Sequence, residues 1–337
     1  MNVRAQNSTA TQSNSPLIEV SELSKKFAEV TAVDQINFTI RQGELFGLLG
    51  PNGAGKTTMI NIFIGLARPD SGKVSINGLD LSINHKAAQH LIGIVPDKSN
   101  LYPELSGFDN LCFCASLYGI PNSEASSRAE ELLDQFNLTE AAHRKFGAYS
   151  SGMKRKLTIA AGIIHHPEIL FLDEPTTGID VTSARQVRKL IADLHRSGMT
   201  ILLTTHYIEE AERLCQRIAF IVKGKIVRID SIENLLQPIQ DIKSIEISFM
   251  KGDDHLSDKL SAAFPEYVFH PISPNQVRIE STEDLILGPL VYYIENQGSQ
   301  IVEARRITLS LEDVFVQVTG LELDKMKNNK EEGKDKK

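Results

Sequence analysis

The sequence is poor in cysteine and has no long apolar run. It holds three cysteines among 337 residues, too few for the disulfide framework of a small secreted protein, and this usage is typical of a reducing compartment. No apolar run approaches the ~18 residues that a membrane-spanning helix needs. Direct membrane insertion by this chain is therefore excluded, while attachment through a partner stays open. Residues 1–16 contain no apolar segment of the signal-peptide kind, and we expect them to form a disordered lead.

An excess of positive charge is also absent. Lys and Arg total 36 against 43 Asp and Glu, which gives a net charge of −7. Because a protein that coats nucleic acid needs a basic surface to neutralise phosphates, this balance argues against a nucleic-acid partner. Cys112 and Cys114 form a C-x-C pair, but no second Cys/His cluster completes a metal site, so we expect buried thiols. The length suggests about two domains, at roughly 150 residues per domain.

Short apolar runs alternate with helix-like segments over residues 17–236. The runs that predict strands are 17–20, 37–40, 45–49, 74–76, 92–95, 169–172, 201–204, 219–222 and 225–228. Helical patterns are expected over 57–66, over 183–196 and over most of 97–166. Strands that alternate with helices predict an α/β domain with a largely parallel sheet.

A second pattern begins near Pro238, which we expect to mark a domain boundary. Between residues 240 and 320 the expected order is strand, helix, strand, strand, helix, strand, at 244–249, 256–264, 266–270, 276–280, 283–296 and 300–307. This βαββαβ order predicts a small α+β domain of the ferredoxin-like kind, with a further helix over 310–319. The mixture of Lys, Glu and Asn in residues 321–337 predicts a disordered charged tail.

The strongest motif is a glycine-rich loop, G-x-x-x-x-G-K-T, between an expected strand and an expected helix. Its glycines let successive backbone N–H groups turn inward around phosphate oxygens, and the following helix directs its positive dipole end at the same anion. Lys56 supplies a cation to the β- and γ-phosphates, and the Thr57 hydroxyl can ligate Mg²⁺. The residues expected to bind the phosphates are Gly50, Pro51, Asn52, Gly53, Ala54, Gly55, Lys56, Thr57 and Thr58.

Two carboxylates and a histidine stand at the ends of two other expected strands. Asp173 and Glu174 follow the run 169–172, and His206 closes the run Ile-Leu-Leu-Thr-Thr. Because ligands bind at the carboxyl edge of an open α/β sheet, these side chains should lie beside the loop. We expect Asp173 to hold Mg²⁺ and Glu174 to orient and deprotonate an attacking water. His206 would hydrogen-bond the γ-phosphate or that water.

Five motifs in a fixed order resemble the nucleotide-binding subunit of an ATP-binding-cassette (ABC) transporter. They are GPNGAGKTT (50–58), YSSGM (149–153), ILFLDEP (169–175), GID (178–180) and TTH (204–206). The resemblance covers residues 17–236 and implies a P-loop NTPase fold with a helical subdomain at about 97–166, which binds ATP and Mg²⁺ and hydrolyses the ATP. YSSGM differs from the family's LSGGQ at Ser151 and Met153 and matches it at Ser150 and Gly152.

The resemblance also implies site residues outside the loop. Two cassettes of this family meet head to tail, so Ser150 and Gly152 would contact ATP bound by the partner, and Asp180 would line the interface. Phe27 matches the aromatic ring that stacks on adenine, although a core position for this ring stays open. Asp97 stands where the family usually has Gln, and it would offer Mg²⁺ a charged oxygen without an amide donor.

The segment LSLEDVFVQVTG (309–320) resembles the ending common in cassettes of drug, lipid or polysaccharide exporters. This implies an ATPase paired with a second copy of itself, which drives export through a separate integral-membrane permease and is held by it on the cytoplasmic face of the membrane. The alternative is a soluble cassette ATPase for assembly or repair, to which only the C-x-C pair points. A third hypothesis is a regulatory ATP sensor. The domain at 240–320 stays open between a regulatory or dimer-supporting module and a stabilising appendage.

Overall fold

The computed structural model describes residues 16–250 and 256–321. The expected disordered lead (1–16) and charged tail (321–337) therefore lie, apart from one residue each, outside the described residues. The chain divides into two compact units, of which one runs to Ser231 and the other spans Ile232–Gly320. Pro238, which we expected at the boundary, instead lies inside helix α8 (Ile232–Gln240) of the second unit.

Helix α8 continues through Pro238 because its buried residues stand on both sides of the proline. Leu235 and Ile239 are four residues apart, so they share one face of the helix, and both are buried. This helix packs against α11 (Leu311–Thr319) of the same unit. A proline in the last turn costs one backbone hydrogen bond, and the apolar contact of the two flanking residues outweighs that loss.

The first unit is built on a six-stranded sheet with the order β10-β9-β3-β8-β7-β6. Its strands are β3 (Leu45–Leu49), β6 (Ile92–Val95), β7 (Ile169–Asp173), β8 (Thr200–Thr205), β9 (Arg217–Val222) and β10 (Lys225–Ser231). Neighbouring strands are parallel except β9 and β10, which form a hairpin at Lys223-Gly224. Strands β3, β7 and β8 are buried along their whole length, which explains their continuous apolar runs.

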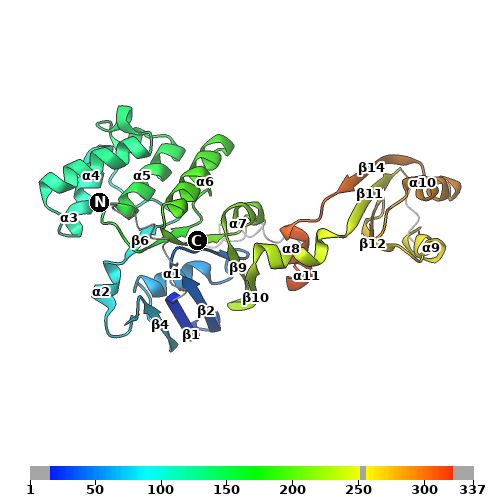
Figure 1. Cartoon of the computed structure of the whole chain (residues 1–337), viewed down its shortest axis with the longest axis horizontal. Helices are drawn as coiled ribbons and strands as arrows, with labels where there is room; N and C mark the ends of the chain where they lie inside the picture. The colour runs from blue at the N-terminus through cyan, green and yellow to red at the C-terminus, as the bar shows by residue number, and fades with distance from the viewer. Residues whose placement is uncertain (1–15, 251–255, 322–337) are drawn as a thin grey trace, which may run out of the picture. The chain divides into compact units, whose positions relative to one another are not determined.

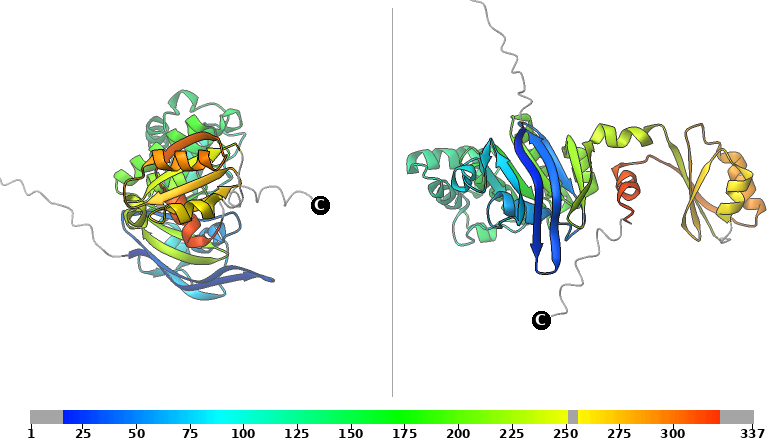
Figure 2. Two further views of the ribbon diagram at one scale, coloured as in Figure 1. Left: turned by 90° about the vertical axis from the view of Figure 1, so that its right-hand side faces the viewer. Right: turned by 90° about the horizontal axis from the view of Figure 1, so that it is seen from below.

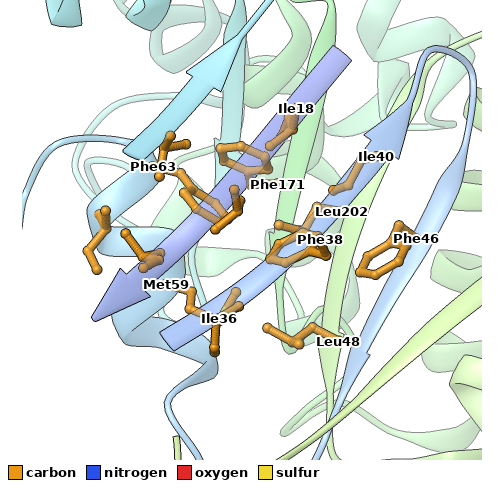
Figure 3. Packing of buried hydrophobic residues seen from close by; sticks show 14 of the residues in the cluster. Ile18, Ile36, Phe38, Ile40, Phe46, Leu48, Met59, Phe63, Phe171 and Leu202 are labelled. Atoms are coloured by element: carbon orange, nitrogen blue, oxygen red, sulfur yellow. The ribbon is translucent and has the colours of Figure 1, made fainter. Parts of the chain in front are cut away.

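A second, antiparallel sheet of this unit has the order β2-β1-β4-β5. Its strands are β1 (Pro16–Phe27), β2 (Val30–Arg41), β4 (Ser71–Ile76) and β5 (Leu79–Asp80). Phe38 of β2 stacks on Phe46 of β3 with 5.3 Å between ring centroids (Figure 3). Phe63, at the end of α1 (Lys56–Phe63), packs on Phe171 of β7 at 5.7 Å. This core fixes α1, and the loop before it, against both sheets.

The remaining helices of the first unit fill the long connections between strands. They are α2 (His85–Gln89), α3 (Gly107–Leu117), α4 (Asn122–Gln135), α5 (Ser151–Ile163), α6 (Val181–Arg196) and α7 (Ile208–Leu214), with 3-10 turns at Thr139–Ala141 and Phe146–Ala148. Helices α3, α4 and α5 pack together within the segment expected to be helical, on a different side of the unit from β1, β2 and β4 (Figure 1). Among the helices in the described ranges, none is long and apolar enough to cross a membrane.

The second unit holds a four-stranded antiparallel sheet with the order β12-β13-β11-β14. Its elements after α8 are β11 (Lys243–Phe249), α9 (Leu256–Ala263), β12 (Val268–Ser273), β13 (Gln276–Ser281), α10 (Leu287–Asn296), β14 (Ile301–Ile307) and α11. Helices α9 and α10 cover the same face of the sheet, where Leu260 and Leu290 join Ile247 in a separate core (Figure 2). The βαββαβ order and the interleaved strands form the expected ferredoxin-like arrangement.

Candidate active site

Three parallel strands bring the candidate residues to one edge of the six-stranded sheet. The glycine-rich loop follows β3, Asp173 ends β7, and His206 follows β8. Leu49 pairs with Thr205 across the β3–β8 ladder, and Asp173 pairs with Thr204 across β7–β8. The carboxyl ends of these strands are therefore level, which is the position where open α/β sheets bind ligands.

The loop keeps its shape because side chains are excluded at two glycines. A Cβ atom on Gly50 would lie 2.1 Å from the carbonyl oxygen of Ile221, and one on Gly55 would lie 2.2 Å from that of Ala32. Gly55 also has a φ of 109°, and it is the residue before α1. The chain thus turns tightly around the N-terminus of α1, where the first-turn N–H groups and the helix dipole favour an anion.

Lys56 lies buried inside this loop, with 5% of its surface exposed. Its Nζ donates hydrogen bonds to the carbonyl oxygens of Gly50 at 2.7 Å and Pro51 at 3.1 Å, and it lies 3.2 Å from Oε1 of Glu174. Burial lowers the pKa of Lys56, and the nearby Glu174 and Asp173 carboxylates oppose that shift. These oxygen partners stand in for the phosphate oxygens that an ammonium group at this position can bind.

Asp173 and Thr57 form a pair of oxygen donors next to Lys56. The Thr57 hydroxyl donates to Oδ2 of Asp173 at 3.0 Å, and the Thr204 hydroxyl donates to Oδ1. Burial raises the pKa of Asp173 in spite of these two hydrogen bonds. A hydroxyl and a carboxylate are ligands that Mg²⁺ prefers, and a bound cation would favour the ionised form of this carboxyl. The donor set therefore fits Mg²⁺.

Glu174 is held by a strained backbone and by two neighbouring side chains, those of His206 and Lys56. Its φ is 50°, a left-handed conformation that a non-glycine residue rarely adopts. Oε2 lies 2.6 Å from Nδ1 of His206 and accepts a hydrogen bond from Thr177 at 3.2 Å. Burial alone would raise the pKa of Glu174, but His206 and Lys56 together outweigh it and lower the pKa. The side chain is thus kept as a carboxylate, the form that a general base needs.

The expected partner-facing residues gather at a second place, where α5 and α6 begin. Ser150 is the N-cap of α5 and accepts from the N–H of Met153 at 3.2 Å, while Asp180 is the N-cap of α6 and accepts from that of Ser183 at 2.9 Å. A Cβ atom on Gly152 would lie 2.3 Å from the Ser183 hydroxyl oxygen. Among the described residues, no hydrogen bond or ion pair joins this place to Lys56 or the two strand-end carboxylates.

Phe27 and Asp97 lie at the surface. Phe27 ends β1 with 50% of its surface exposed, and the Lys25 ammonium lies 5.2 Å from its ring centroid. It is therefore not a core residue, and its ring is open to stacking. Asp97 follows β6, and its backbone carbonyl accepts a hydrogen bond from Arg155 at 2.6 Å.

The structure adds two buried charged residues that the sequence did not point to, Arg155 and Glu210. Glu210 has 1% of its surface exposed, and it accepts a hydrogen bond from the Thr176 hydroxyl at 2.8 Å. It lies on α7, between the buried Ile208 and Ala211. The helical spacing of these apolar residues therefore gave only a weak indication that Glu210 is buried. The neighbouring acidic residues Glu209 and Glu212 are instead typical of a helix face exposed to solvent.

The cysteine pair lies in α3, away from these residues. Cys112 and Cys114 are partly buried, and burial raises the pKa of Cys114 to about 11. Within residues 16–250 and 256–321, no group of three or more His, Cys, Asp or Glu side chains is arranged to hold a metal ion. Both thiols are only partly buried, where the sequence predicted buried ones.

Comparison with known proteins identifies the family. A family described as "ABC transporter" matches residues 33–177. The chain is 36% identical over 295 residues to the doxorubicin resistance ATP-binding protein DrrA of Mycobacterium tuberculosis, a match that covers 86% of this chain and 89% of that protein. The chain belongs to the ABC transporter family. It is an ATP-binding, ATP-hydrolysing subunit of that family, as its motifs predict.

Two other relatives of this ABC protein are named for resistance to a compound or for export. The linearmycin resistance ATP-binding protein LnrL of Bacillus subtilis is 41% identical over 219 residues, which cover 65% of this chain and 70% of that protein. The Nod factor export ATP-binding protein I of Rhizobium etli is 32% identical over 316 residues, covering 91% and 95%.

Solved structures confirm the ABC cassette fold. An ATP-binding subunit of an ABC transporter aligns with a TM-score of 0.60 at 29% identity, over 66% of this chain and 92% of that one. A dimeric ATP-binding cassette in a post-hydrolysis state, bound to ADP and Pi, aligns with a TM-score of 0.58 at 27% identity, over 64% and 98%.

Proposed function

We propose that this ABC ATPase works as a pair of identical chains that drive export through a separate integral-membrane permease, on the cytoplasmic face of the membrane. Support comes from relatives that align over most of their length and are named for drug resistance or Nod factor export. A dimeric neighbour of known structure supports the pairing. The observation that carries the hydrolytic role is the Glu174 carboxylate, held between Lys56 and His206 at the end of β7.

ATP and Mg²⁺ would bind around the N-terminus of α1. The backbone of residues 50–58 would surround the phosphates, and Lys56 would exchange its carbonyl partners for β- and γ-phosphate oxygens. Thr57 and Asp173 would ligate Mg²⁺, with Asp97 as a third oxygen donor from β6. The cation, when bound, neutralises charge that develops on the phosphate oxygens. Phe27 would stack on the adenine ring.

Hydrolysis would use Glu174 as the base. A water oxygen forms a new bond to the γ-phosphorus, the bond from that phosphorus to the β–γ bridging oxygen breaks, and Glu174 accepts the water proton. His206, at 2.6 Å from Oε2, fixes the orientation of this carboxylate. General-base help of this kind is typically worth about 10²–10⁴ in rate.

The partner chain would complete each site. Ser150 and Gly152 begin α5, and a helix N-terminus binds anions, so they would contact the γ-phosphate of ATP held by the partner. Asp180 would line the same interface. Shifting a pair from 1:99 closed to 99:1 closed needs about 5.5 kcal/mol of preferential binding to the closed state. Phosphate contacts from both chains are a reasonable source of that free energy.

The variant Glu174→Gln tests this function. It keeps the size of the side chain and removes the base, so we expect ATP binding to persist, turnover to fall at least ~10²-fold, and ATP-bound dimers to accumulate. Steady-state ATPase rates and size-exclusion chromatography with ATP measure these effects. Glu209→Gln is the matched control, because Glu209 is exposed and paired with Arg213. Normal hydrolysis by Glu174→Gln would overturn the assignment of the base.

A soluble cassette ATPase for assembly or repair is the alternative, and co-purification separates the two. A multi-helix membrane protein recovered in stoichiometric amount supports export, whereas soluble partners alone would favour the alternative.

A further inference from the structure

Arg155 joins helix α5 to the backbone that carries Asp97. Its guanidinium donates one hydrogen bond to the carbonyl of Pro96 at 2.7 Å and another to the carbonyl of Asp97 at 2.6 Å. The side chain is buried, with 7% of the residue's surface exposed. A buried guanidinium with two carbonyl partners fixes both the position and the direction of the segment that it holds.

Two neighbouring contacts on the same face of α5 support this attachment. The hydroxyl of Thr158, one helical turn after Arg155, lies 2.8 Å from that of Ser99. At Gly93 on β6, a Cβ atom would lie 2.2 Å from the carbonyl oxygen of Gly162 on α5. Helix and strand are thus in close contact, and the segment after β6 is tied to the helix that Ser150 and Gly152 begin.

The charge of Arg155 faces acidic groups of the site. Burial lowers its pKa, and the carboxylates of Asp97, Asp173 and Glu210 oppose that shift. An arginine stays charged in proteins. The guanidinium holds the backbone of Asp97 itself, so its positive charge lies beside the residue that carries this carboxylate.

We propose that Arg155 is a positioning residue that holds the segment 96–99 on α5 and offsets the negative charge of Asp97 beside the triphosphate. This inference rests on the proposed function. Asp97 brings a negative charge to a place where the family usually has neutral Gln, and that charge repels the anionic nucleotide. A fixed cation held against the same backbone reduces the repulsion.

A double-mutant cycle on nucleotide binding tests the proposal. The variants are Arg155→Met, Asp97→Asn and the double variant, and the readout is the Kd of a fluorescent ATP analogue in EDTA, which separates charge from any metal contact of Asp97. We expect Arg155→Met to weaken binding by about tenfold. Asp97→Asn alone should change binding little or tighten it, and the double variant should recover most of the loss.

The matched control is Arg128→Met. Arg128 also donates to a backbone carbonyl of the α5 region, that of Ile164 at 2.9 Å, and it is not part of the proposed nucleotide site. Its loss should leave the Kd unchanged with or without Asp97→Asn. If Arg155→Met yields too little folded protein, Arg155→Gln completes the same cycle.

A purely structural role for Arg155 predicts that Asp97→Asn restores nothing, and that result would overturn the proposal. Equal Kd values for Arg155→Met and the wild type would do the same. Failure of the proposed function would be distinguishable, because it would appear as absent ATPase turnover in the wild type, while the binding cycle would still report the coupling between the two residues.

Discussion

At the scale of single residues, the site contains buried charges whose partners come from distant parts of the sequence. Lys56 faces Glu174 from the start of α1 and His206 faces it from the end of β8, and their combined effect outweighs the burial of that carboxylate. At Glu210, hydrogen bonds offset less of the effect of burial, so burial dominates and raises the pKa of this carboxyl. Its partner Thr176 lies on the turn between Glu174 and Asp180, so this one hydrogen bond ties α7 to the turn after the base.

Glu210→Gln should become more stable relative to the wild type as pH rises. A carboxyl whose pKa is raised by folding stabilises the protein fully below its unfolded pKa, and this contribution is lost as pH rises through the folded pKa. Glutamine keeps an oxygen for the Thr176 hydroxyl and has no proton to lose. The difference in free energy of unfolding, measured by urea denaturation, should therefore grow in favour of Glu210→Gln between about pH 5 and 8.

Glu210→Ala provides the contrast at the same position. It leaves the buried Thr176 hydroxyl without its acceptor, and it should be about 1–3 kcal/mol less stable than Glu210→Gln at any pH in this range, because neither variant titrates at this position. A pH-independent difference between Glu210→Gln and the wild type would show that the burial of this carboxyl does not set its titration.

At the scale of secondary-structure elements, the N-termini of α5 and α6 depend on one close contact. Gly152 leaves no room for a Cβ atom, because the Ser183 hydroxyl oxygen would lie at 2.3 Å and the Ser183 Cβ at 2.6 Å. Asp180 caps α6 through the N–H of the same serine. Gly152 and Asp180, both proposed to face the partner chain, are thus packed together within one chain, so a shift of either helix would displace the other.

Gly152→Ala should therefore be destabilising, although alanine normally favours a helix. We expect a cost of about 1–3 kcal/mol from overpacking against Ser183, measured by chemical denaturation. Ser183→Gly removes both contacting atoms, so adding it to Gly152→Ala should recover most of the loss. Gly288→Ala is a control of opposite sign, because nothing lies within 4 Å of its Cβ position and alanine should stabilise α10. Failure of Ser183→Gly to recover stability would contradict the contact.

The sequence predicted elements well where burial imposes a pattern. The runs at 45–49, 169–172 and 201–204 correspond to β3, β7 and β8, because central parallel strands are apolar throughout. The positions of Lys56, Asp173 and His206 followed from the shared carboxyl edge of those strands. Ends of elements were less predictable: α10 begins at Leu287 instead of residue 283, since Leu285 is buried before the helix starts.

The contacts missed by sequence reasoning are long-range. Arg155 and Pro96 are 59 residues apart, and Thr176 and Glu210 are 34 apart. No local periodicity links such pairs, because each side chain finds its partner only when helix and strand pack. The prediction at Pro238 failed for the opposite reason. Proline is a strong local signal for the end of a helix, but the burial of Leu235 and Ile239 on either side of it outweighs that signal.

At the scale of the whole molecule, the two units have separate hydrophobic cores. The core of the first unit joins β1, β2, β3, α1 and β7, whereas the core of the second joins β11, β13, α9 and α10. The proposed nucleotide contacts all lie in the first unit. Each unit therefore has a core of its own and should unfold cooperatively by itself. ATP should directly stabilise only the first unit.

ATP should stabilise the first unit without changing the second. A ligand that binds only the native state adds about 2.7 kcal/mol at 100 times its Kd. In the Glu174→Gln variant, which should hold ATP without turnover, the slowest amides of β3, β7 and β8 should exchange about 100-fold more slowly with Mg²⁺ and ATP. Hydrogen exchange read by mass spectrometry should show β11 and β13 unchanged. Lys56→Ala, which should not bind ATP, is the control in which neither unit responds. Equal slowing in both sets of strands would show instead that the units unfold as one body, and that the C-terminal unit shares the free energy of nucleotide binding.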